Sequence, residues 1–99
     1  MLTDPYATLR DRVTGTVLDG PGVAPPPLRR AAAAGRGLPP ELQPLVDTIR
    51  AHAYRVTDDD VARPQAQHGD DVMFDIVVSA ALGAAHDRLT AGLRALEEA

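Results

Sequence analysis

The chain has 99 residues, a formal net charge of -4 and no cysteine. This length predicts one domain, and a domain this short buries only about 60–65% of the surface of its unfolded chain. The absence of cysteine excludes disulfides, thiolate metal sites and cysteine nucleophiles in this chain, and the acidic balance argues against nucleic-acid binding, which needs a basic face.

Large core residues are scarce, because the sequence holds one Phe, two Tyr and no Trp. Packing on Leu, Val, Ile and Ala favours close helix contacts or burial against another subunit. All ten basic residues are Arg, which excludes lysine Schiff-base chemistry. No segment has the pattern of a signal peptide, and the longest run without charge or proline, 76–86, is shorter than the ~20 residues that cross a bilayer. We therefore expect a cytoplasmic protein that does not associate with membranes.

The first predicted helix covers residues 5–18. Asp4 is a suitable N-cap, and Pro5 suits the first helical position. Apolar residues recur along this helix at helical spacing: Tyr6, Leu9, Val13, Val17 and Leu18. The Gly-Pro-Gly sequence at 20–22 predicts its end.

Residues 20–44 form a Pro/Gly-rich connecting region that contains seven of the nine prolines and cannot be one regular element. Within it, the segment 28–34 predicts a short helix, because prolines lead into it and Gly35 stands at its end. The next helix is predicted over 39–55, opening at one of two consecutive prolines, with Pro44 tolerated only in its first turn.

A variant of the capping box predicts the start of the fourth helix, with Thr57 as N-cap and Asp60 three residues on. The acidic residues of this first turn also suit the positive end of the helix dipole. Pro64 costs about 3 kcal/mol inside a helix. We therefore expect this helix to be broken, or only a turn or two long, before Gly69.

The last predicted helix, 71–97, is the longest and is apolar over most of its girth. Its polar wedge consists of Asp75, Ser79, His86 and Thr90. Such a helix is either central to a bundle or shared with a partner subunit, and its small residues allow another helix to approach closely. We favour a subunit interface, formed by Phe74, Val77, Val78, Ala81, Gly83, Ala84 and Ala85.

Together these elements predict an all-α fold. We expect a single domain over residues 1–99, a small bundle of four to five helices whose last helix is long and two-faced.

The second half of the chain carries an ordered pattern. A helix ends in His52-Ala53-Tyr54, and the step Val56-Thr57-Asp58-Asp59-Asp60-Val61 follows it. The Ala-rich final helix then closes with Arg88-Leu89 and Gly92-Leu93. From Leu45 to Leu96, about half of the chain, this order resembles the C-terminal half of alkylhydroperoxidase D-like proteins of the carboxymuconolactone decarboxylase superfamily. The resemblance implies an all-α, oligomeric fold.

In the redox members of that superfamily, the chemistry belongs to a Cys-x-x-Cys-x-x-x-His motif on a helix. One register places Leu45, Thr48 and His52 at this spacing, without either thiol; the better interpretation is that the motif-bearing segment is absent. Thiol peroxidase and disulfide reductase activity are therefore excluded. The decarboxylase branch does not depend on a cysteine pair, and the resemblance leaves it open.

Three residues are candidates for catalysis: His86, His52 and Asp75. His86 shares the polar wedge with Asp75 and suits acid–base work, unless the wedge is simply the side that faces solvent. His52 is either a general base or ligand, or a helix-end histidine favoured by the dipole. His68 stands beside a glycine and is expected to be exposed.

No metal or cofactor site is predicted. The acidic clusters 58–60 and 70–71 lack the spacing of a calcium loop and are explained by helix capping, and no two histidines stand four residues apart. The pair Arg29-Arg30 has the chemistry to contact an anionic ligand or partner, but we interpret it as a solvated charge patch. The proline-rich segment 20–27 is interpreted as a rigid linker rather than a polyproline ligand.

The sequence thus favours a non-redox, homo-oligomeric accessory or protein-interaction protein on an alkylhydroperoxidase D-like helical fold, with a further protein partner left open. The alternative is a small cofactor-independent enzyme of the carboxymuconolactone decarboxylase type, which would use His/Asp acid–base chemistry at a subunit interface. A small-ligand binder or regulator is a third class.

Overall fold

The computed structural model describes residues 6–98. This part of the chain holds helices and no strand, which confirms the all-α prediction. In chain order the elements are α1 (Ala7–Asp19), α2 (Pro26–Ala34), α3 (Gln43–His52), the short 3-10 helix η1 (Ala53–Arg55), α4 (Asp58–His68) and α5 (Asp70–Glu98). Within residues 6–98, none of the helices combines the length and the apolar character that a membrane span requires.

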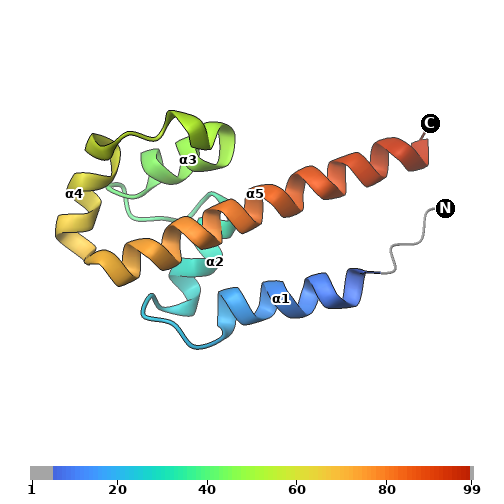
Figure 1. Ribbon diagram of the computed structural model, residues 1–99, viewed down its shortest axis with the longest axis horizontal. Helices are drawn as coiled ribbons and strands as arrows, with labels where there is room; N and C mark the ends of the chain where they lie inside the picture. The colour runs from blue at the N-terminus through green and yellow to red at the C-terminus, as the bar shows by residue number, and fades with distance from the viewer. Residues whose placement is uncertain (1–5, 99) are drawn as a thin grey trace.

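Helix α5 is the long element on which the others are organised (Figure 1). Its 29 residues extend one position beyond each end of the predicted 71–97. Helices α2 and α3 pack against it and form the core. The buried apolar residues of this core include Leu42, Val46, Ile49, Met73, Ile76 and Ala80.

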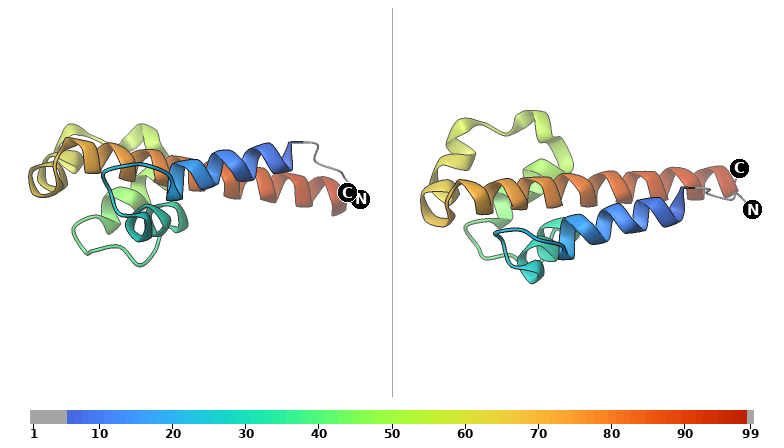
Figure 2. Two further views of the ribbon diagram at one scale, coloured as in Figure 1. Left: turned by 90° about the horizontal axis from the view of Figure 1, so that it is seen from below. Right: turned by 60° about the horizontal axis from the view of Figure 1, so that its bottom comes forward.

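Helix α1 lies beside the C-terminal half of α5 and runs in the opposite direction (Figures 1 and 2). The start of α1 and the end of α5 therefore lie at the same end of the molecule. These two helices reach beyond the core, and the molecule is elongated, with extents of 47 × 28 × 20 Å. The predicted caps Asp4 and Pro5 lie outside the described residues.

The proline-rich region contains α2, as predicted, but α2 begins two residues earlier, because prolines fit the first turn of a helix. Gly35 ends it in the left-handed region with φ 77°. Helix α3 begins at Gln43 rather than at position 39 or 40, and its last predicted residues form η1. A start at 39 or 40 would place Pro44 beyond the first turn, where a helix needs every N–H.

The capping box of α4 is confirmed. The Thr57 hydroxyl accepts from the Asp60 N–H at 3.2 Å, and the Asp60 carboxylate accepts from the Thr57 N–H at 2.9 Å. The prediction that Pro64 breaks this helix was wrong, since α4 continues for 11 residues. Proline has a helical φ and removes one hydrogen bond, and the Pro64 side chain is buried and lines a hollow with Leu45 of α3.

Candidate functional site

A buried arginine holds the turn between α1 and α2. Arg29 is 3% exposed, and its guanidinium donates three hydrogen bonds to main-chain carbonyls. Nε bonds to Ala24 at 2.9 Å, Nη1 to Val17 at 2.7 Å and Nη2 to Gly20 at 2.7 Å. The side chain therefore satisfies the carbonyls of Val17 and Gly20 at the end of α1, which have no helical partner, and that of Ala24 before α2.

The predicted charge patch is thus divided between two different roles. Arg30 is exposed and pairs with Asp19, as a solvated arginine would. Arg29 is not solvated, and the prediction was wrong for it, because it stands one turn into α2 on the side that faces the turn. The Gly-Pro-Gly run before α2 was the available signal, since such a turn leaves carbonyls that need a donor.

Asp75 of α5 completes this anchor. Its Oδ2 accepts from the Val23 N–H at 2.8 Å and from the Ala24 N–H at 2.9 Å. Arg29 therefore binds the carbonyls of the 17–24 segment while Asp75 binds its N–H groups. We call Arg29 and Asp75 the turn anchor. The Asp75 carboxylate positions the turn, because it accepts from two main-chain N–H groups of this segment. This structural role accounts for Asp75 without a part in proton transfer.

Substitutions of Asp75 test whether its carboxylate positions the turn. We expect Asp75→Ala to lower the free energy of unfolding by about 2 kcal/mol, because two N–H groups lose a charged acceptor. Asp75→Asn keeps an oxygen at the Oδ2 position, and about half of the loss should be recovered. Urea unfolding of both variants measures this order, and equal stabilities of the two would contradict it.

The polar wedge of α5 includes both buried and exposed positions. Ser79 is 0% exposed, and its hydroxyl has no hydrogen-bond partner within residues 6–98. Asp75 bonds the turn, and His86 lines a hollow with Thr14 and Leu18 of α1. The wedge is therefore not one solvent-facing side, because α1 and the turn after it lie along part of it, while His86 is exposed.

His86 and Asp75 are not brought together. They stand eleven residues apart on one helix, which is about 16 Å along its axis. His86 is exposed, although it also lines two adjoining hollows of about 230 and 110 Å³ beside α1. The neighbouring Asp87 forms an ion pair with Arg50. Within residues 6–98, the structure thus shows no ion pair between His86 and a carboxylate.

The other two histidines have local partners. His52 is exposed at the end of α3, and its Nδ1 lies 3.4 Å from the Tyr54 hydroxyl. His68 was expected to be exposed in a loop, but it is the half-buried last residue of α4, with Nε2 3.2 Å from the Glu41 carboxylate. That contact joins α4 to the segment before α3, which the sequence does not indicate.

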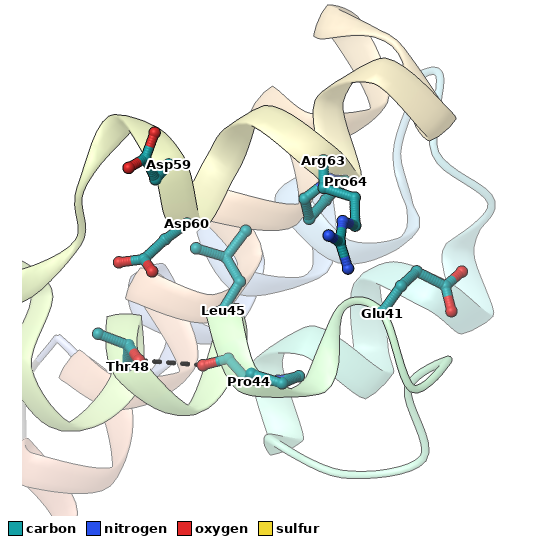
Figure 3. A pocket seen from close by; sticks show the side chains of 8 residues that line it. All are labelled: Glu41, Pro44, Leu45, Thr48, Asp59, Asp60, Arg63 and Pro64. Atoms are coloured by element: carbon teal, nitrogen blue, oxygen red, sulfur yellow. Dashed lines mark hydrogen bonds between the residues drawn. The ribbon is translucent and has the colours of Figure 1, made fainter.

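A hollow of about 230 Å³ lies between α3 and α4 (Figure 3). Its polar lining includes Thr48, Asp59, Asp60 and Arg63. The Thr48 hydroxyl bonds the Pro44 carbonyl, and Asp60 caps α4. Across residues 6–98, no group of three His, Asp or Glu side chains is arranged to hold a metal ion. Two polar groups of this hollow thus hold the helices that line it.

The largest unexplained feature is an exposed apolar face on the two helices that reach beyond the core. Phe74 is 69% exposed and Leu9 is 55% exposed, with Val13 and Leu89 also exposed. We call this the α1–α5 face and define it by eight residues: Leu9, Val13, Val17, Phe74, Val78, Ala81, Ala85 and Leu89.

Two hollows connect both helices of this face. One, of about 260 Å³, is lined by Val17 of α1 and by Phe74 and Val78 of α5. The other, of about 110 Å³, lies between α1 and α5 at Ala85 and Leu89. Val17 of the α1 stripe therefore adjoins the α5 stripe, whereas Arg10 and Thr14 form the α1 side of the second hollow. The α1 stripe was visible in the sequence as a helical repeat, but its exposure was not.

The seven residues predicted for a subunit interface divide into two groups. Gly83 packs against the main chain of Ala33 in α2, and Ala84 is buried, so the close helix approach predicted for these residues occurs within the chain. The other five are partly or fully exposed on α5: Phe74, Val77, Val78, Ala81 and Ala85. Their role in an interface stays a prediction.

Comparison with protein families, with curated proteins and with solved structures finds no significant match to this chain. The structure supports a small all-helical protein, and the alkylhydroperoxidase D-like assignment stays a prediction.

Proposed function

We propose that this chain is a non-redox protein-interaction protein that works as an oligomer and has no catalytic task of its own. The observation that carries the proposal is the α1–α5 face. Burying a Leu- or Phe-sized side chain stabilises by about 1.5–3 kcal/mol, so large apolar side chains exposed on two adjacent helices favour a protein partner.

The resemblance to alkylhydroperoxidase D-like proteins is consistent with this proposal. It implies a helical fold that oligomerises, while the chain has no cysteine to perform the redox step of that superfamily. We propose that the helical scaffold of such proteins serves here for association alone.

Sedimentation of the purified protein at micromolar concentration, together with affinity capture from the native host, tests this function. We expect either a mass above that of the 10.5 kDa chain or a stoichiometric partner. A monomer that recovers no partner would overturn the proposal.

The alternative, a cofactor-independent enzyme of the carboxymuconolactone decarboxylase type, stays a prediction that no specific observation favours. His86 and Asp75 are separated along α5, and the Asp75 oxygen is occupied by main-chain N–H groups. A second copy would have to supply the missing acid or base.

A further inference from the structure

We propose that the occupant of the α1–α5 face is a second copy of this chain, so that α1 and α5 of two copies form a four-helix arrangement. This inference rests on the proposed function, and it names the partner. Each copy would present the same face to the other, as in an isologous dimer with two-fold symmetry.

The first observation is the weak attachment of α1. This helix has 13 residues, and Leu18 is the one residue of Ala7–Asp19 that is buried. Isolated helices of about 12–15 residues are marginal in water, and most helices in proteins are stabilised by a packed face. Leu9 and Val13 of the α1 stripe are exposed in the single chain, while Val17 is half-buried beside α5. A second copy would cover the exposed residues.

The second observation is the amount of surface. The chain exposes 6561 Å², whereas a folded monomer of 10.5 kDa exposes about 5,400 Å². Its radius of gyration is 14.7 Å, against about 12.6 Å for a compact domain of this length. The chain as a whole therefore exposes about 1,100 Å² more surface than a compact monomer of its mass, and each partner in a standard stable interface buries about 800 Å². A second copy on the α1–α5 face would cover part of this exposed surface.

The third observation is the distribution of side-chain size. The exposed positions of α1 are bulky, with Leu9 and Val13, whereas the middle of the α5 stripe is small, with Ala81 and Ala85. If α1 of one copy lies across α5 of the other, bulky residues meet small ones in both directions. The eight residues of the face are uncharged, and Arg29, Asp75 and Arg10 line the two hollows beside them. A surface that complements itself in this way favours a second copy over an unrelated partner.

The decisive variant places a charge in the middle of the face. Ala85 is exposed, so Ala85→Arg fits the single chain and keeps a helix-forming residue. The matched control is Ala66→Arg, at an exposed position of α4 away from the face. In sedimentation equilibrium we expect a dimer for the unmodified chain and for Ala66→Arg. Ala85→Arg should raise the dimer dissociation constant about 100-fold, since the symmetric interface contains the change twice.

Cross-linking tests which helices meet. The chain has no cysteine, so an introduced one is the only thiol. Val13→Cys and Ala85→Cys, mixed as separate proteins and oxidised, should give a covalent heterodimer, whereas Val13→Cys mixed with Ala66→Cys should not. If circular dichroism shows that Ala85→Arg has lost helix, the cross-linking experiment tests the second-copy inference in its place.

These experiments distinguish a failure of the second-copy inference from a failure of the proposed function. A dimer that Ala85→Arg leaves intact, or the absence of the Val13–Ala85 cross-link, overturns the second-copy inference while oligomerisation stands. A purified monomer that captures a different host protein through Phe74 overturns the inference and retains the proposed function. A monomer without any partner overturns both.

Discussion

Gly83→Ala is expected to lower the free energy of unfolding by about 2–3 kcal/mol, although alanine is the better helix former. A Cβ at this position would overlap the carbonyl oxygen of Ala33 and would lie 2.6 Å from its carbonyl carbon. The obstacle is main chain, so α2 and α5 would have to separate. Arg50 donates to the same Ala33 carbonyl and pairs with Asp87, which extends the disturbance to α3.

The matched control is Gly15→Ala, inside α1. A Cβ there has no neighbour within 4 Å, so the substitution should raise the free energy of unfolding by about 1 kcal/mol through helix propensity alone. Thermal unfolding followed by circular dichroism gives both values. The same exchange thus has opposite signs at two helical glycines, and a stabilising Gly83→Ala would contradict the close contact between α2 and α5.

Gly83 also shows which part of the helix packing the sequence predicts and which part it does not. The small residues around it correctly predicted that a helix approaches α5 closely. The partner assigned to them was another subunit, whereas the structure places α2 of the same chain there. Residue size reports how near a neighbour comes, but it carries no information about which segment the neighbour is.

The elements themselves were largely predictable, because proline, glycine and capping residues act within a few positions. Thr57 and Gly35 limit helices as expected. The error at Pro64 has a tertiary explanation, since Pro64 is buried in the folded chain beside the hollow that Leu45 also lines, and apolar burial favours the folded helix. Helix propensity describes an isolated segment and does not include such a contact.

The candidate residues were less predictable for the same reason. Asp75 stands out as a carboxylate on an apolar helix, but its partners lie more than fifty positions earlier, at Val23 and Ala24. Arg29 and Arg30 are the same residue type at adjacent positions, and they differ only in the direction that their side chains face. The apolar stripe of α1 predicts a helix that packs against a neighbour. The local sequence does not indicate whether that neighbour belongs to the same chain or to another.

Arg29→Met is expected to lower the free energy of unfolding by about 3 kcal/mol. Methionine fills much of the same volume and is helix-compatible, so the loss comes from the three carbonyls, of Val17, Gly20 and Ala24, that would remain without a donor. For a domain of this size the melting temperature should fall by about 12–24 °C. Arg29→Lys should recover only part of this, because one ammonium cannot reach three carbonyls that a planar guanidinium spans.

The adjacent residue provides the control. Arg30→Met removes an exposed pair with Asp19, and such pairs contribute about 0–1 kcal/mol. The two substitutions change charge and volume equally, one position apart in the same helix. A large difference between them therefore measures the burial of Arg29 rather than its charge. Equal melting temperatures would mean that the turn after α1 holds without this side chain, and the anchor would then rest on Asp75 alone.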